Sequence, residues 1–165
     1  MLEKRISYDH SITENGNIQV RQVTEYLKDG KVTDKKYSNP YTPKDVQNMA
    51  GFDDRSKEIV AVIIDPKIKA EFAIETEANR TQDGDIVEII SHDRVIDEDG
   101  KIAVRRITRI FDEGKEVSKK YHRSWIMSGD DPKNNDVISK ALAKKLHTPK
   151  VVAAYKTTLA EVVKI

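Results

Sequence analysis

The sequence contains no cysteine, which excludes a disulfide framework, a thiolate metal site and a cysteine nucleophile. No apolar run approaches the roughly 20 residues that a membrane-spanning helix requires, and the first residues lack the apolar stretch of a signal peptide. We therefore expect a protein that makes no membrane contact and resides in the cytoplasm of the cell that makes it.

Motifs that carry common enzyme chemistry are also missing. There is no glycine-rich phosphate loop, no Gly-x-Ser-x-Gly nucleophile elbow and no His-Glu-x-x-His metal motif. The run Gly129-Asp130-Asp131 matches the Gly-Asp-Asp of polymerase palms, but its place beside Pro132, ahead of a predicted helix, is typical of a helix-capping loop. We expect a protein that is not an enzyme and uses no cofactor.

Histidine is also scarce, since the chain has four histidines in all. Only two of them, His92 and His122, could lie near each other, across the first and third predicted strands of the second half, whereas a metal site usually needs three or four convergent ligands. The positions 84 residues earlier, which the internal repeat described below aligns with them, carry Tyr8 and Ser38 instead. We therefore expect surface histidines and no metal site.

What the chain does contain is typical of a folded globular protein. Of its 165 residues, 38% are hydrophobic and 35% are charged, and the net charge is +1. Residues 1–83 carry a net charge of −2 and residues 84–165 one of +3. Neither half has the strongly basic balance that binding to a phosphate backbone usually requires.

A comparison of the sequence with itself indicates an internal repeat. With an offset of 84, residues 6–37 align without a gap with residues 90–121 and share 15 identities over 32 positions. With an offset of 83 the alignment continues into the later part of each half, although residues 40–55 and 124–138 align poorly. We predict a tandem duplication. The two units are residues 1–83 and 84–165.

Turn signals divide each unit into strands. Asn15-Gly16 and Asp99-Gly100 predict tight hairpin turns, because both central positions favour positive φ. A second turn signal, an acidic residue followed by glycine, occurs 14 positions later in each unit, at 29–30 and 113–114. These signals predict three antiparallel strands per unit. The predicted strands are 3–14, 17–28, 31–39, 87–98, 101–112 and 115–124.

Each unit is expected to close with two short helices. Asp65-Pro66 and Thr148-Pro149 place an N-cap residue before a proline at the first helical position. The predicted fold is therefore α+β, a tandem duplication of a β-β-β-α-α unit in which each antiparallel three-stranded meander is followed by two short helices. The predicted helices are 56–64, 66–76, 137–146 and 149–162.

The apolar pattern changes parity in the middle strand of each unit. Ile18 and Val20 alternate with polar residues, but Val23 falls on the opposite parity, and Ile107 repeats this change in the second unit. Either a β-bulge or a strand that is buried on both faces explains the change.

The second unit resembles small uncharacterised proteins of tailed bacteriophages. The resemblance rests on an Arg-x-x-Thr strand (residues 105–108), the turn Glu113-Gly114, the strand end Tyr121-His122-Arg123 and a closing helix after Thr148-Pro149. It covers residues 86–162 well and the first unit weakly, because Ser38-Asn39 replaces the His-Arg pair there. The resemblance implies a phage protein, built into the virion or associated with it, and transfers no catalytic residues.

Residues that both units share, together with a basic and aromatic group in the second unit, are the candidate partner contacts. We expect them to bind other phage or virion subunits in a homo- or hetero-oligomeric assembly. The candidates are Arg21, Tyr37, Tyr41, Arg105, Arg109, Tyr121, His122, Arg123 and Trp125.

Two further hypotheses remain open. An arginine-rich sheet face with an aromatic side chain is how single-stranded nucleic acid is often bound, although pairing of these arginines with acidic neighbours is the more ordinary arrangement. An enzyme would need a polar cleft between the units lined by Asp9, Asp93, Tyr37 or Tyr121. The leading hypothesis is a non-catalytic structural or assembly protein of a phage.

Overall fold

The computed structural model describes residues 1–163 and has an α+β fold with one curled antiparallel sheet. The strand order is β3-β2-β1-β5-β6-β7, and β4 pairs with β5 outside this path. The strands are β1 (Leu2–Ile12), β2 (Ile18–Lys28), β3 (Lys31–Tyr37), β4 (Arg80–Asp83), β5 (Ile86–Ile96), β6 (Ile102–Asp112) and β7 (Lys115–Ile126).

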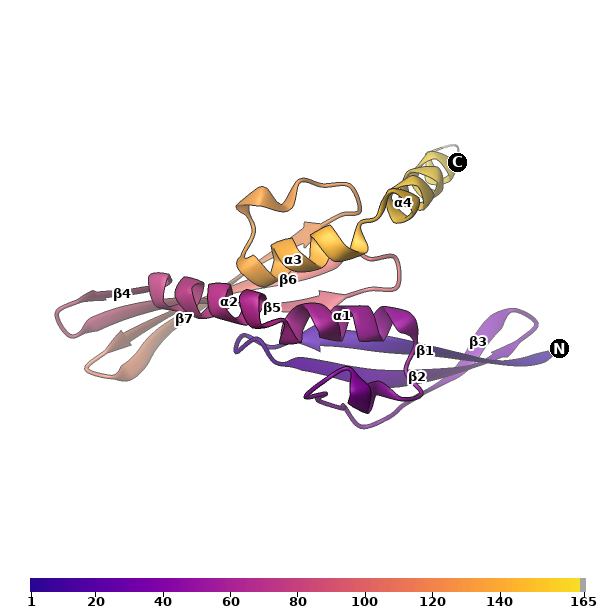
Figure 1. Cartoon of the computed structure of the whole chain (residues 1–165), viewed down its shortest axis with the longest axis horizontal. Coiled ribbons are helices and arrows are strands. Elements are labelled where there is room, and N and C mark those ends of the chain that lie inside the picture. The colour runs from indigo at the N-terminus through magenta and orange to yellow at the C-terminus, as the bar shows by residue number, and fades with distance from the viewer. Residues whose placement is uncertain (164–165) are drawn as a thin grey trace.

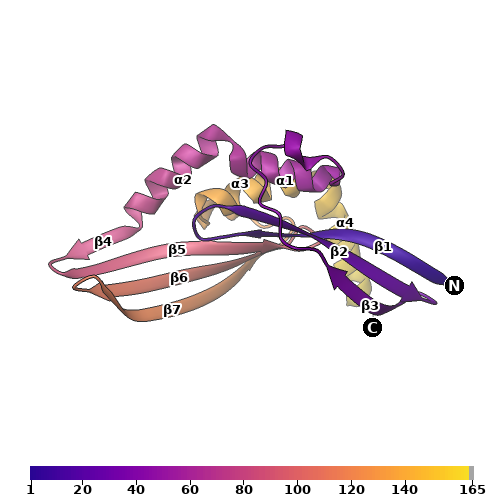
Figure 2. The same ribbon diagram turned by 90° about the horizontal axis from the view of Figure 1, so that it is seen from below.

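Three of the four α-helices cover one side of this sheet. Figures 1 and 2 show α1, α2 and α3 on the same side, while α4 extends away from the sheet at one corner. We call the opposite side, which carries none of α1, α2 and α3, the open face. The helices are η1 (Gln47–Met49), α1 (Asp54–Ile64), α2 (Pro66–Ala78), η2 (Pro132–Asn134), α3 (Val137–Leu146) and α4 (Pro149–Val162), η1 and η2 being short 3-10 helices.

The helix ends follow the predicted chemistry. Asp65 and Thr148 each accept a hydrogen bond from a backbone N–H of the following helix, with proline at the first helical position. Asp131 in the Gly-Asp-Asp run accepts one from the N–H of Lys133 and so caps η2, as expected of a capping loop. The predicted helix over residues 56–64 is present as α1.

One strand was not predicted. β4 is short, polar and exposed along its whole length, and so it lacks the alternating pattern that marks a strand. It forms because the turn around Gly84, which has φ +59°, returns the chain onto β5. β4 begins two residues after the last residue of α2, and its pairing with β5 therefore ties α2 to the edge of the sheet.

Both halves of the chain contribute to one core. Ile12 and Ile59 from the first half and Ile102 and Leu142 from the second are fully buried in the same cluster. Burial of this kind is the main stabilising contribution in a small protein. The two halves therefore fold against each other, and neither encloses a core of its own.

The two meanders join through a short antiparallel contact between β1 and β5. Only three residue pairs connect these strands, and the middle pair is Ser11 opposite Val95. Away from this contact the two meanders diverge. The turn between β2 and β3 lies at one end of the molecule and the turn between β6 and β7 at the other (Figures 1 and 2).

The change of apolar parity in β2 and β6 results from burial on both faces. The pairing of β1 with β2 runs without interruption past Val23, and the pairing of β5 with β6 does the same past Ile107. Register shifts occur only further on, after Tyr26 with β3 and after Ile110 with β7. Of the two explanations, burial on both faces is the correct one, because Val23 and Ile107 are buried away from the helices.

Candidate functional site

Strand alternation assigns side chains to the open face. Ile12 and Val20 point into the helix-covered core, so their neighbours Ser11 and Arg21 point to the open face. The same alternation, followed through the registers of β3, β6 and β7, places most of the candidate contacts there. Those on the open face are Arg21, Tyr37, Arg105, Arg109, Tyr121, Arg123 and Trp125.

Two candidates lie elsewhere. His122 is opposite Arg106 in the register and therefore belongs to the helix side of β7. Tyr41 pairs with Val20 and stacks on Phe52 with ring centres 5.7 Å apart. Tyr41 and Trp125, which are 84 positions apart, are thus separated by the fold, because Tyr41 pairs with β2 one residue out of the register of β2 and β3, whereas Trp125 keeps the register of β6 and β7.

Arg21 lies between an aspartate and a tyrosine. Its Nη2 donates a 2.8 Å hydrogen bond to Asp9 Oδ2, and its guanidinium carbon is 4.3 Å from the centre of the Tyr37 ring. The hairpin turn fixes this contact, because Asp9 is directly opposite Arg21 in the register. Tyr37 remains 53% exposed. The arginine is therefore held flat against an accessible aromatic ring.

The second meander contains the same arrangement at the aligned positions. Arg105 Nε donates to Asp93 at 3.1 Å, and its guanidinium carbon is 5.0 Å from the ring centre of Tyr121. This hydrogen bond and the negative charge of Asp93 raise the pKa of Arg105, although burial acts against them. Asp9 and Asp93 are thus each paired with the arginine directly opposite on the neighbouring strand.

Arg109 is paired across the two halves. Its Nη2 donates a 2.9 Å hydrogen bond to Glu14 of the first hairpin turn, and Glu116 of β7 lies 3.3 Å from its Nε. The hydrogen bond from Arg109 lowers the pKa of Glu14, assisted by one from Ser91. Sequence reasoning missed Glu14 as a partner, because no local pattern links a turn to a strand 95 positions away.

The position aligned with Arg109 carries an acidic residue. Glu25 accepts a 2.6 Å hydrogen bond from Arg5 Nε and lies 2.6 Å from Lys35 Nζ. These hydrogen bonds, first that from Lys35 and then that from Arg5, lower the pKa of Glu25. Positive and negative charges therefore alternate along the open face in both meanders.

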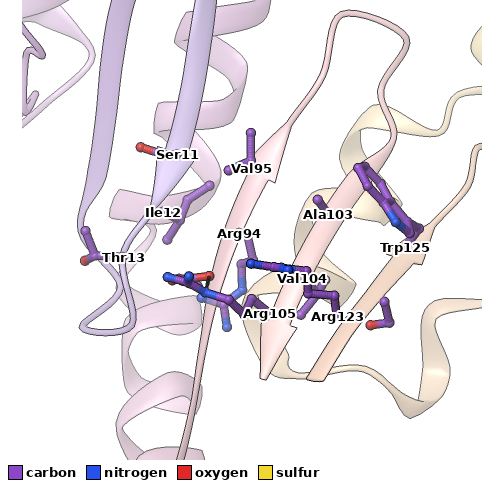
Figure 3. A pocket seen from close by; sticks show the side chains of 12 residues that line it. Ser11, Ile12, Thr13, Arg94, Val95, Ala103, Val104, Arg105, Arg123 and Trp125 are labelled. Carbon is purple, nitrogen blue, oxygen red and sulfur yellow. Dashed lines mark hydrogen bonds and ion pairs between the residues drawn. The ribbon is translucent and has the colours of Figure 1, made fainter. Parts of the chain in front are cut away.

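Two cavities of about 380 Å³ each flank the contact between β1 and β5. In the first, Trp125 and Arg123 project from β7, and Val95 and Arg105 lie opposite them (Figure 3). The second is on the other side of the contact and is lined mainly by residues of the first meander, including Pro40 where the first has Ser124, together with residues 95–98 of the second. Trp125 is 60% exposed, which makes it the largest accessible apolar side chain of the first cavity.

Two buried polar residues lie under the contact on the helix side. His10 is within 2.8 Å of Ser56 Oγ, and Arg94 donates a 3.1 Å hydrogen bond to Ser139 Oγ and pairs with Asp136. Both His10 and Arg94 are 1% exposed. Through Ser56, Ser139 and Asp136 these groups attach α1 and α3 to the sheet.

Among residues 1–163 no cluster of histidine and acidic side chains is arranged to hold a metal ion. Within the same residues, no helix has both the length and the apolar character needed to cross a membrane. No family model, curated protein or solved structure matches this chain.

Proposed function

We propose that the chain is a non-catalytic assembly protein of a tailed bacteriophage, which binds other virion subunits through the open face of its sheet. The observation that carries this proposal is the combination of exposed aromatic side chains with arginines that already have acidic partners. Such a surface is nearly neutral and partly apolar, and aromatic residues and arginine are the residue types enriched in protein interfaces.

The charge pairing favours a protein partner over nucleic acid. Arg21, Arg105 and Arg109 each have a carboxylate within hydrogen-bonding distance. A phosphate group would have to displace these carboxylates, and their negative charges would repel the nucleic-acid backbone. A protein with mixed charges can bind beside them without breaking the pairs.

We also propose that the two halves descend from a tandem duplication. In support, the order of strands and helices repeats, and Asp9 opposite Arg21 corresponds to Asp93 opposite Arg105. The middle pair of the contact between β1 and β5 also joins two aligned residues, as expected at the two-fold axis of a symmetric pair. Joining two copies in one chain makes their contact intramolecular, so three residue pairs and a shared core suffice.

The test uses the phage that encodes this chain. We expect mass spectrometry of purified particles and assembly intermediates to detect the protein, and the substitution Trp125→Asp to lower its incorporation at least tenfold. A hot-spot tryptophan contributes about 2 kcal/mol or more to binding, which corresponds to a factor of about 30. The matched control is Val117→Asp, an equally exposed residue near the far end of β7, which should leave incorporation unchanged.

Two outcomes would contradict the proposal. One is absence of the protein from particles and intermediates alike. The other is binding of single-stranded DNA at low salt that is lost with Arg123→Ala, because Arg123 has no carboxylate partner among the described residues and is the cation best placed to contact a phosphate.

A further inference from the structure

The two meanders differ in how their outermost segments are covered. The N-terminal part of β5 has a partner on its outer edge, since Arg80–Asp83 pairs with Ile86–Ile89. β1 pairs with β5 only at His10–Ile12, and within the described residues Leu2–Asp9 has no partner on that edge. The edge that β4 covers in one meander is therefore free in the other.

The helix side shows the same difference. Ile90 is half-buried beneath α2, where it lines a cavity with Phe72, and its N–H donates to the carbonyl of Asn79. Its counterpart in the first meander, Ile6, is 49% exposed, and Leu2 on the same side of β1 is more exposed still. We call Leu2, Ile6 and the free edge of β1 the uncovered wing.

The helix that corresponds to α2 is α4, and it does not lie on the uncovered wing. In its first turn Val151 lies against Gly100 and Val152 against Gly129, and of the later residues of α4 that the structure describes only Tyr155 is half-buried. Beyond this turn α4 extends away from the body (Figure 1). It is connected to α3 through His147 and Thr148, which leaves room for a change of direction at this link.

The exposed part of α4 is apolar on one side. Tyr155, Leu159 and Val162 follow the helical spacing of a single stripe, and Val162 is 63% exposed. At the positions aligned with Leu159 and Val162, the first half carries Thr76 in α2 and Asn79 directly after it. The outer end of α4 therefore exposes apolar side chains where the corresponding positions of the first half are polar.

We propose that the uncovered wing binds α4 of a second copy of this chain, in the position that α2 occupies over β5. α2 itself supports this occupant, because it packs beside β5 at the corresponding place in the other meander. A second copy is favoured because α4 points away from its own β1, and exchange of an identical element between two chains needs no newly evolved surface. This inference rests on the proposed correspondence between the two halves, but it concerns a different face from the open face and does not depend on what the open face binds.

Cysteine cross-linking tests the inference directly, because the chain has no cysteine of its own. One chain carries Ile6→Cys and the other Val162→Cys, a pair chosen because the aligned residues Ile90 and Asn79 are in hydrogen-bonding contact. After mild oxidation of the mixed chains we expect a disulfide-linked heterodimer, at least fivefold more abundant than the disulfide-linked homodimer of either variant. The matched control uses Ile74→Cys in place of Val162→Cys. Ile74 lies on α2 and is similarly exposed, and its variant should give no excess of heterodimer.

The double variant with both substitutions in one chain identifies the source of α4. Cross-linked dimers and larger species support exchange between copies, whereas a cross-linked monomer would show that α4 folds back on its own β1 and would overturn the inference. Absence of any cross-link would overturn it as well.

A second measurement does not depend on thiols. In sedimentation equilibrium we expect Leu159→Asp to weaken self-association at least tenfold, and Thr157→Asp, on the side of α4 opposite the stripe, to leave it unchanged. Trp125→Asp should also leave self-association unchanged, so that failure of the α4 contact and failure of the open face are distinguished.

Discussion

The burial of His10 makes a specific prediction about stability and pH. Its ring contacts Ser56 through one nitrogen, while Nδ1 is buried without a hydrogen-bond partner in the protein. Burial, assisted by the positive charge of Arg55, lowers the pKa of His10 to about 4, although Asp53 and Asp9 act in the opposite direction. The imidazole is therefore neutral in the folded protein at pH values where it is charged in the unfolded chain.

The size of the effect follows from the two pKa values. In the unfolded chain His10 titrates at about 6.5, so between pH 6.5 and about 4 the unfolded state binds more protons than the folded state. The stability that neutral His10 contributes is then fully present above pH 6.5 and is lost as the pH falls toward 4. With about 1.4 kcal/mol for each pH unit, the loss reaches about 3 kcal/mol.

The assay is denaturant unfolding of the wild type and of His10→Gln at several pH values from 4 to 8. Glutamine keeps a hydrogen bond to Ser56 but does not titrate, so the stability difference between the two proteins isolates the histidine. We expect this difference to shift against the wild type by about 3 kcal/mol between pH 7 and pH 4. A difference that stays constant over this range would refute the reasoning, since it would mean that His10 titrates normally in the folded protein.

Two further predictions concern stability. Arg94→Met leaves the buried carboxylate of Asp136 without its cation and should lower the free energy of unfolding by about 3–5 kcal/mol. Arg21→Met breaks a half-exposed pair and should lower it by about 1 kcal/mol or less. Equal losses for the two variants in denaturant unfolding would contradict this prediction. Gly16 and Gly30 have φ of +75° and +78°, so alanine is strained at both, but only at Gly16 would its Cβ meet a ring carbon of α2, at 2.9 Å. Gly16→Ala should therefore be less stable than Gly30→Ala by about 1–3 kcal/mol in thermal or denaturant unfolding, and equal stability would argue against the contact.

Local chemistry predicted much of this fold. The hairpin turns and the proline-led helices depend on residues close together in the sequence, and the structure has them where expected. The contact between Asp9 and Arg21 was also within reach, because the tight turn at Gly16 fixes which residues of β1 and β2 are opposite each other.

Features that depend on tertiary packing were beyond the sequence. β4 is a strand only because β5 is beside it, and its polar residues carry no strand pattern. The pairing of Glu14 with Arg109 joins the two halves, so it follows from how the meanders meet. In the same way, the aligned residues Tyr41 and Trp125 occupy opposite sides of the sheet because β7 continues through Trp125, whereas β3 ends at Tyr37 and the chain meets β2 again at Tyr41 one residue out of register.

His10 and Arg94 attach a helix to the sheet at corresponding points of the two halves. They are aligned residues beside the contact between β1 and β5, and each reaches a buried serine in the first turn of its helix, Ser56 in α1 and Ser139 in α3. Asp136, which caps α3, is buried and needs a cation, which Arg94 supplies. His10 makes the corresponding link to α1 without a charge, at the expense of one unsatisfied nitrogen. Each helix is therefore fixed to the sheet at the same point by different chemistry, and only the link through His10 is expected to weaken between pH 6.5 and 4.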